Sequence, residues 1–272
     1  MSFIPSKISI DTDLLALVGE ISRKQGELSA YRHGIRDSEA IEATAAVDAV
    51  HFSTKIEGNL FTRDQVTQVL RIHKTTRSPT RDLHEIMNYA RARRMVREGA
   101  LKGRAFNDEW VLQTHAEILK GIVKGRLRGH YREAQCVVQD AKTRAIVYMA
   151  PEWGDVEPLM KGLLRWLRAQ RKAGGSALLL AAQFHFEFVT IHPFMDGNGR
   201  LARLLTNGIL MASGYEVERY AALEKQHERN RGDYYRALRE LQANNYYDIS
   251  PGQDIRTWVS YWLRCLLATY DE

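Results

Sequence analysis

The sequence predicts a mostly α-helical fold that contains one β-hairpin. Apolar residues recur at the helical period along most of the 272-residue chain. Two segments, residues 176–191 and 200–212, are apolar on nearly every face, which is typical of buried helices. Residues 136–149 alone combine β-branched residues with a polar turn, as a hairpin does. We therefore expect a helical core with a single hairpin attached to it.

The first half of the chain predicts five helices, which are delimited by capping and stop signals. In order, they are an amphipathic helix over residues 13–28, a helix from an N-cap at Ser38 to Ile56 or Glu57 with Gly58 as a left-handed stop, a short helix capped by Thr62, a long helix from Pro79 to about Gly99, and a helix capped by Asn107.

The second half begins with the hairpin, in which the segments CVVQ and AIVYM flank the polar turn DAKTR. Helices then resume, and the pair Gly174-Gly175 separates the first two of them. The expected helices cover residues 156–171, 176–191, 200–212, a stretch capped by Asp233, and residues 254–268. The chain contains no internal repeat and no low-complexity linker.

The chain carries 39 Lys and Arg against 33 Asp and Glu, a formal net charge of +6. This excess suggests polyanionic partners such as nucleotides, nucleic acids or acidic proteins. The arginines cluster in residues 91–97, 124–132 and 165–172. Such runs are usually solvated helix faces, and no helix-turn-helix, zinc-finger or RNA-binding signature accompanies them. Nucleic acid is therefore not the favoured partner.

Composition also limits where the protein works. The longest apolar stretch, Ala177 to Ala182, is far below the ~20 residues that span a bilayer. The N-terminus meets acidic residues early and lacks the apolar region of a secretory signal. Two cysteines, Cys136 and Cys265, cannot form a disulfide framework or a structural zinc site. We expect a cytoplasmic protein with no membrane partner.

The most informative segment is HPFMDGNGRLAR, residues 192–203, between the two buried helices. Pro193 ends the preceding helix. Gly197 and Gly199 permit a tight turn that points backbone N–H groups inward at the start of the next helix, which makes an anion site. Arg200 and Arg203 add two guanidinium groups suited to bidentate phosphate contacts.

Two further residues of this segment suggest what the anion does. Asp196 is unexpected beside an anion unless a cation bridges the two, and Mg²⁺ held by one carboxylate and phosphate oxygens fits. His192 could accept a proton near neutral pH. Together these groups indicate phosphoryl or nucleotidyl transfer. Taken singly, each residue is more often structural: a helix end, a turn, a loop or a surface face.

The segment resembles the Fic family signature H-P-F-x-D-G-N-G-R-x-x-R at every specified position. The family consists of α-helical enzymes that mostly transfer AMP from ATP to a Tyr, Ser or Thr hydroxyl of a protein and release pyrophosphate. Doc-type kinases differ at Gly197 and Gly199, so the intact glycines favour nucleotidyl transfer. The resemblance implies these roles: His192 as the base, Asp196 as the Mg²⁺ ligand, Gly197, Asn198, Gly199 and Arg200 as the anion hole, Arg203 on the γ-phosphate, and Phe194 packed under the loop.

Two flanking regions agree with this resemblance. The hairpin resembles the Fic flap, whose free edge would bind the extended backbone of the target protein. Its apolar residues would serve equally well in a hairpin that covers the core; they are Val137, Val138, Ile146 and Val147. Residues 228–238 resemble the helix on the nucleoside side, which implies that Asn230, Tyr234 and Tyr235 lie near adenine and ribose. Tyr234 also belongs to a helical stripe with Leu238 and Leu241 that is typical of core residues.

The segment STKIEGN, residues 53–59, resembles the Fic inhibitory motif [S/T]-x-x-x-E-[G/N]. Ser53 and Glu57 lie on one helix face at i and i+4. Glu57 falls in the last turn, where the helix dipole disfavours a carboxylate by ~0.3–1 kcal/mol, so a cationic partner is expected. The resemblance implies that Glu57 pairs with Arg203, that Ser53 anchors the helix, and that the γ-phosphate is excluded.

These observations divide the chain into an N-terminal helical region (1–100) with the inhibitory motif, a Fic catalytic domain (101–245) and a C-terminal helix (246–272). The leading hypothesis is an autoinhibited protein adenylyltransferase that uses ATP and Mg²⁺, docks its target protein on the flap, and could form a homodimer. Three alternatives stay open: removal of AMP with the help of Glu57, transfer from another nucleotide donor, and a non-enzymatic basic helical adaptor.

Overall fold

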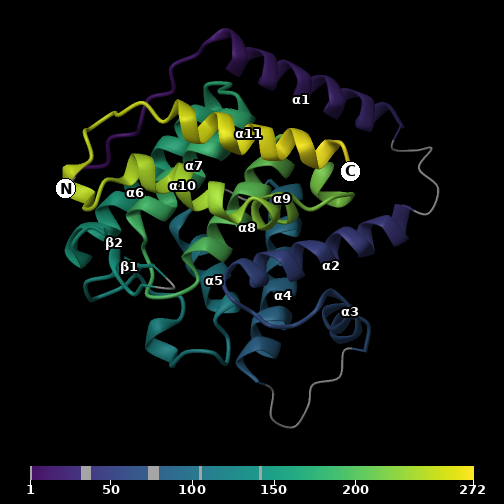
Figure 1. Ribbon diagram of the computed structural model, residues 1–272, viewed down its shortest axis with the longest axis horizontal. Helices are drawn as coiled ribbons and strands as arrows, with labels where there is room; N and C mark the ends of the chain where they lie inside the picture. Colours follow the sequence, from purple (N-terminus) through teal and green to yellow (C-terminus); the bar gives the residue numbers. More distant parts are fainter. Residues whose placement is uncertain (1, 32–37, 73–79, 104–105, 141–142) are drawn as a thin grey trace.

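The computed structural model describes residues 2–31, 38–72, 80–103, 106–140 and 143–272 (Figure 1). It confirms the mostly α-helical class with one hairpin. The α-helices are α1 (Thr12–Tyr31), α2 (Ser38–Ile56), α3 (Arg63–Ile72), α4 (Arg81–Leu101), α5 (Asp108–Ile118), α6 (Trp153–Lys172), α7 (Ala177–Ile191), α8 (Asn198–Met211), α9 (Leu223–Arg229), α10 (Arg231–Gln242) and α11 (Arg256–Tyr270). The strands are β1 (Val137–Gln139) and β2 (Ile146–Met149), and the 3₁₀ turns are η2 (Gly125–Leu127), η3 (Val217–Arg219) and η4 (Tyr246–Asp248).

The pair α7 and α8 forms the centre of the molecule (Figure 1). Nearly every residue of both helices is buried, as their uniformly apolar sequences predict. Helices α4 and α5 pack against α8, and α6 and α11 pack against α7. The loop between the two central helices, residues 192–197, is therefore held from both sides by buried secondary structure.

The N-terminal segment contacts α7, and α1 then packs along α11 (Figure 1). The backbone N–H of Ser6 donates to Glu187 Oε1 at 2.7 Å, and Gln183 Nε2 donates to the Ser6 carbonyl at 2.7 Å. The backbone of Lys7 forms an isolated parallel β-bridge with Asp254, just ahead of α11. These contacts fix the first residues to the same helix that ends at the candidate site.

Helix α2 packs against α9, α3 and α4, which brings its C-terminal end close to the start of α8. Two of the expected helix caps are present, at Thr62 and Asn107, whereas Ser38 is already the first residue of α2. Thr62 and Gln65 form a reciprocal capping box at the start of α3, and Asn107 Oδ1 accepts a hydrogen bond from Trp110 N at 2.9 Å. Pro79 lies outside the described residues, and Thr80 is the N-cap of α4. Gly58 has φ +97°, as expected of a left-handed stop.

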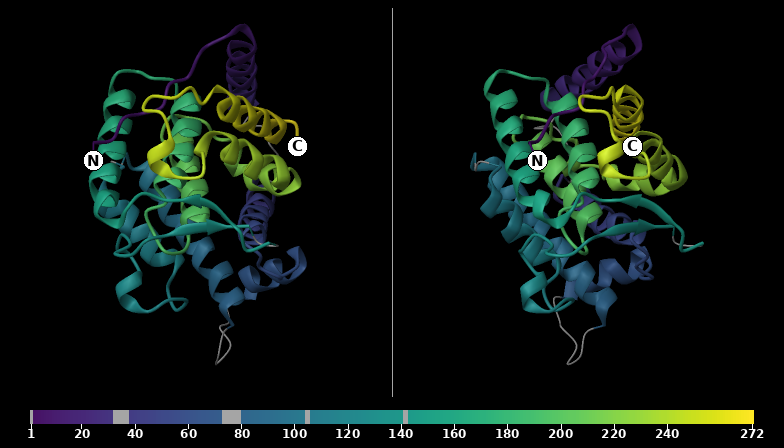
Figure 2. Two further views of the ribbon diagram at one scale, coloured as in Figure 1. Left: turned by 60° about the vertical axis from the view of Figure 1, so that its left-hand side comes forward. Right: turned by 90° about the vertical axis from the view of Figure 1, so that its left-hand side faces the viewer.

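The hairpin extends from the helical body (Figure 2). Its antiparallel register pairs Val137 with Met149 and Val138 with Tyr148, with an irregularity before Gln139. Tyr148 is buried and its hydroxyl donates to the Thr190 carbonyl at 2.6 Å, which ties the hairpin to the end of α7. Within the described residues β1 pairs only with β2, so its other edge is available to a further strand.

Two expectations about the second half need correction. Helix α9 was not expected, because its buried face consists largely of polar residues such as Glu224, Gln226 and His227 and so lacks an apolar period. Helix α10 begins at Arg231, ahead of Asp233, and Asp233 pairs with Arg236 on the exposed face. None of the helices in the described part of the chain is both long and apolar enough to cross a bilayer.

The hairpin anchor predicts a stability effect. Replacement of Tyr148 by Phe removes the hydroxyl from a buried carbonyl and should lower the free energy of unfolding by about 1–2 kcal/mol. Urea denaturation followed by circular dichroism measures this change. Tyr31→Phe is the matched control, because Tyr31 is 73% exposed. Equal stabilities of the two variants would show that the anchor contributes nothing.

Candidate functional site

The loop between α7 and α8 is closed by its own side chains. Asn198 Oδ1 accepts a hydrogen bond from Phe194 N at 3.0 Å, and Asn198 Nδ2 donates to the Phe194 carbonyl at 2.8 Å. Gly197 adopts φ +85°, a conformation that a side chain would strain. The first intrahelical bond of α8 joins Leu201 N to Gly197 O. The backbone N–H groups just before it therefore point out of the helix end, as an anion site requires.

His192 ends α7 in the left-handed conformation, with φ 50° and ψ 60°. Its Nδ1 lies 3.2 Å from the Val189 carbonyl, which can only accept, so Nδ1 carries the proton and Nε2 keeps its lone pair. Burial lowers the pKa of His192, and the nearby charge of Arg132 lowers it further. The neutral imidazole is therefore favoured near pH 7, which suits a general base.

Arg132 is only 3% exposed and supports this loop by hydrogen bonds to its backbone. Its Nε donates to the His192 carbonyl at 2.9 Å, and its backbone N–H donates to the Pro193 carbonyl at 3.0 Å. Its other guanidinium nitrogens donate to the carbonyls of Ala134 and Pro151. The expectation that the run 124–132 forms a solvated face is wrong at this residue. No local pattern distinguishes it, because three of its four carbonyl partners, those of Pro151, His192 and Pro193, lie in other segments.

Phe194 is fully buried and packs under the loop, as expected. Its ring stacks on His115 of α5 with 3.6 Å between ring centroids. His115 Nδ1 accepts from Gly129 N at 3.0 Å, so its Nε2 carries the proton and donates to the Asp196 carbonyl at 3.1 Å. Burial lowers the pKa of His115 to about 4, so this histidine is a neutral support for the loop.

The Asp196 side chain is 32% exposed, and both carboxylate oxygens have arginine partners. Arg200 Nη2 lies 2.7 Å from Oδ1, and Arg81 Nη2 of α4 lies 2.6 Å from Oδ2. In the described ranges no group of three or more His, Cys, Asp or Glu side chains could hold a metal ion. A single exposed carboxylate suits Mg²⁺ that takes its remaining ligands from phosphate and water, so Asp196 fits the expected ion in that form.

Arg203 is buried within α8, with its side chain 2% exposed. Its Nε donates to Ser53 Oγ at 2.8 Å, and its Nη2 donates to the Ser53 carbonyl at 2.9 Å and to Glu57 Oε1 at 2.8 Å. Burial by itself would lower the pKa of Arg203, but the Glu57 carboxylate outweighs it and the pKa is raised. The pairing expected from the sequence therefore exists in the structure.

Glu57 also reaches the start of α8. A Cβ atom added to Gly199 would lie 2.5 Å from Glu57 Oε1 and 3.2 Å from Arg203 Nη1. The carboxylate thus lies against the backbone of the helix N-terminus, where the anion of a ligand would bind. Glu57 is 31% exposed at its side chain, so it closes the site from the solvent side.

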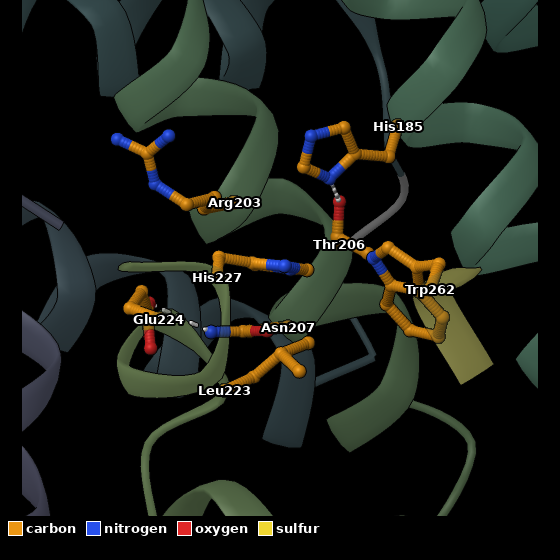
Figure 3. Close-up of a pocket in the computed structure, with 8 residues that line it drawn as sticks. All are labelled: His185, Arg203, Thr206, Asn207, Leu223, Glu224, His227 and Trp262. Atoms are coloured by element: carbon orange, nitrogen blue, oxygen red, sulfur yellow. Dashed lines mark hydrogen bonds between the residues drawn. The ribbon is translucent and has the colours of Figure 1, made fainter. Parts of the chain in front are cut away.

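A polar cluster fills the space behind Arg203 (Figure 3). The guanidinium points away from Asn207 and Glu224, which are joined by a hydrogen bond of 3.2 Å. Burial, with the charge of Arg203, holds the pKa of His227 at about 3, and burial likewise lowers the pKa of His185. Both histidines are therefore neutral, and the cluster supports a single buried cation.

The residues expected on the nucleoside side lie in different environments. Tyr234 is 2% exposed, and its hydroxyl lies 2.9 Å from His185 Nε2, in the core stripe with Leu238. Tyr235 is half-buried, and burial and the Glu57 carboxylate raise its pKa. Asn230 is exposed at the start of α10. Their contact with a nucleoside stays a prediction.

Four supporting residues of the site are not predictable from the sequence. They are Arg81, Glu85, His115 and Arg132. Each contacts the loop or its arginines from an element distant in sequence, so no motif spacing could have revealed them.

Comparison with known proteins relates this geometry to one family. Residues 105–210 match the model of the Fic/DOC family. Over 252 residues the chain is 27% identical to a protein adenylyltransferase Fic of Drosophila persimilis, covering 92% of this chain and 45% of that protein. It is 28% identical to the corresponding protein of Culex quinquefasciatus over 253 residues, covering 92% and 46%. The chain thus spans less than half the length of these relatives.

Solved structures show the same fold. A Fic family protein from Desulfovibrio desulfuricans superimposes with a TM-score of 0.81 at 26% identity, covering 98% of this chain and 75% of that chain. A Fic domain containing signaling protein from Bacteroides thetaiotaomicron gives a TM-score of 0.76 at 21% identity, covering 94% and 95%. The second likeness concerns the fold alone.

The buried position of Arg132 gives a second stability prediction. Arg132→Met keeps much of the side-chain volume but leaves three carbonyls without this donor, so the free energy of unfolding should fall by about 2–4 kcal/mol. Chemical denaturation measures the loss. Arg126→Met removes an exposed arginine of the same segment and should change stability by less than about 0.5 kcal/mol. A similar loss in both variants would contradict the role of Arg132.

Proposed function

Because this chain carries a Fic/DOC-family domain at residues 105–210, we propose that it is a protein adenylyltransferase that transfers AMP from ATP to a hydroxyl group of a target protein. The observation that carries the proposal is the meeting of a neutral His192, Asp196 and two buried arginines at the N-terminus of α8. The names of the similar proteins support the same chemistry.

In the proposed reaction His192 acts as the general base. Its free Nε2 takes the proton from the target hydroxyl, and the hydroxyl oxygen forms a bond to the α-phosphorus of ATP. The bond between the α-phosphorus and the bridging oxygen breaks, and pyrophosphate leaves with its electron pair. Arg132 donates a hydrogen bond to the backbone carbonyl of His192, and His192 Nδ1 donates to the Val189 carbonyl. These two bonds set the orientation of the imidazole before substrate binds.

The N-terminus of α8 would hold the phosphates of ATP. Backbone N–H groups of residues 197–200, together with Arg200, would bind the α- and β-phosphates, and Arg203 would bind the γ-phosphate. Asp196 would hold Mg²⁺, which neutralises phosphate charge when bound. These groups stabilise the charge that develops on the leaving pyrophosphate, which is the largest contribution expected in such transfers.

The target protein would dock on the hairpin. The outer edge of β1 can add an extended segment of the target as a further strand. Val137, Val138 and Val147 are half-buried, and Ile146 is 57% exposed, so the hairpin offers apolar contacts beside that edge. Tyr148 fixes this edge relative to His192 through its bond to the end of α7.

We also propose that the enzyme is autoinhibited by Glu57. In this proposal its carboxylate occupies Arg203 and lies against Gly199, so the γ-phosphate cannot bind and the α-phosphate is misaligned. The proposed organisation assigns inhibition to residues 1–100, catalysis to residues 101–245 and a supporting helix to residues 246–272. Removal of AMP is the second candidate, since the partial exposure of Glu57 would let it orient a water molecule.

Substitution of Glu57 tests the inhibitor and that of His192 tests the base. Glu57→Gly should raise transfer by about 10²–10³-fold, because it frees a buried guanidinium for the γ-phosphate. Intact-mass measurement of self-modification or of an added protein substrate with Mg²⁺ and each of ATP, GTP, UTP and CTP detects the product. His192→Ala in the same background should abolish it. An unchanged rate in Glu57→Gly would contradict the inhibitory role of Glu57. If the wild type, but not Glu57→Gly, removes AMP from a modified target, the second candidate function is favoured.

The lowered pKa of His192 predicts the pH dependence of transfer. The reaction needs the neutral imidazole, so the rate of Glu57→Gly should rise with pH and reach half of its plateau value at a pH below the usual histidine value of about 6.5. Initial rates at saturating nucleotide, measured between about pH 5 and 8, give the profile. A rate that falls as pH rises through this range would rule out His192 as the base.

A further inference from the structure

The carboxylate of Asp196 is held by two arginines of different character. Arg200 belongs to α8, is 2% exposed and is a fixed part of the site. Arg81 comes from the first turn of α4 and its side chain is 60% exposed, yet its Nη2 lies 2.6 Å from Asp196 Oδ2. Arg81 is thus a solvent-exposed cation that binds Oδ2 of Asp196, while Arg200 binds Oδ1.

The position of Arg81 is fixed by Glu85, one helical turn further along α4. Arg81 Nε lies 3.1 Å from Glu85 Oε1, and Arg200 Nη1 lies 3.3 Å from the same atom. Glu85 is 8% exposed at its side chain, so this small network is shielded from water on its inner side. Arg81 is therefore held in place by more than a single surface pair.

The same network reaches the segment that follows Glu57. Asn59 Nδ2 donates to Glu85 Oε2 at 3.0 Å and to the Asp82 carbonyl at 3.0 Å. The N–H of Leu60 adds a bond of 3.3 Å to the Asp82 carboxylate. The stretch that carries Glu57 is therefore joined directly to the first turn of α4. The segment of residues 57–60 thus contacts Arg203 through Glu57. It also contacts Glu85, whose partner Arg81 pairs with Asp196.

We propose that Arg81 is a second inhibitory contact, which competes with a divalent cation for Asp196. The inference rests on the proposed nucleotide-binding role of this site. Arg81 occupies one of the lone-pair sites of Oδ2, and its positive charge repels a metal ion that approaches the same oxygen. Because Arg81 is exposed, it can leave without opening the core. In this arrangement Glu57 blocks the γ-phosphate position while Arg81 opposes the metal at the neighbouring residue.

Equilibrium binding of a fluorescent ADP derivative, titrated with Mg²⁺, tests the competition without measuring activity. ADP lacks the γ-phosphate, so it does not compete with Glu57 for Arg203. Arg81→Gln should lower the Mg²⁺ concentration that gives half-maximal enhancement of ADP binding by about two- to fivefold, the range expected for removal of a partly exposed ion pair. Arg94→Gln, an exposed arginine of the same helix, should match wild type.

Each other outcome has a definite meaning. An unchanged Mg²⁺ dependence in Arg81→Gln overturns the competition. Equal weakening of ADP binding with and without Mg²⁺ also overturns it, because Arg81 would then be a phosphate ligand. Wild type that is folded by circular dichroism but binds no ADP at any Mg²⁺ concentration overturns the nucleotide-binding function itself, and the inference with it.

Discussion

The burial of the Arg203 guanidinium is the constraint on which this structure depends. A cation with 2% of its side chain exposed must have hydrogen-bond acceptors and a nearby anion, or folding would leave an uncompensated charge inside the protein. Ser53 supplies two of the acceptors and Glu57 supplies the charge. Helix α2 is therefore docked on α8 by the very group that the proposed reaction needs for phosphate. In the proposed reaction an anionic ligand can displace Glu57 from Arg203, because the phosphate supplies the negative charge that the carboxylate supplied.

The interior behind Arg203 follows from the same constraint. His185 and His227 are buried next to a permanent cation, so each stays neutral rather than adding a second charge. Neutral imidazoles can accept as well as donate, which suits a cluster built from hydroxyl, amide and carboxylate groups. Tyr234, whose hydroxyl meets His185, is part of this support. The polar core thus joins α7 to α10 through His185 and Tyr234 without placing a second charge beside Arg203.

Sequence alone predicts the parts of this protein whose physics is local. The loop of residues 192–203 carries its turn, its helix start and its charged groups in one run, and Asn107 caps a helix that follows it directly. Supporting residues such as Arg132 and Glu85 could not be predicted, since arginines and glutamates read as surface residues until their distant partners are known. Helix α9 could not be predicted for a similar reason, because its buried face is largely polar and gives no apolar period.

The contact between Glu57 and the backbone of Gly199 has a consequence for how related sequences diverge. Any side chain at position 199 would occupy the space that the Glu57 carboxylate fills, since even a Cβ would lie 2.5 Å from Oε1. In a sequence with such a side chain, the tip of the glutamate must shift away from the helix N-terminus or the glutamate must be absent. The two positions should therefore covary among sequences similar to this chain despite their distance along it, and a residue other than glycine at 199 should go with a changed position of the glutamate or with its loss.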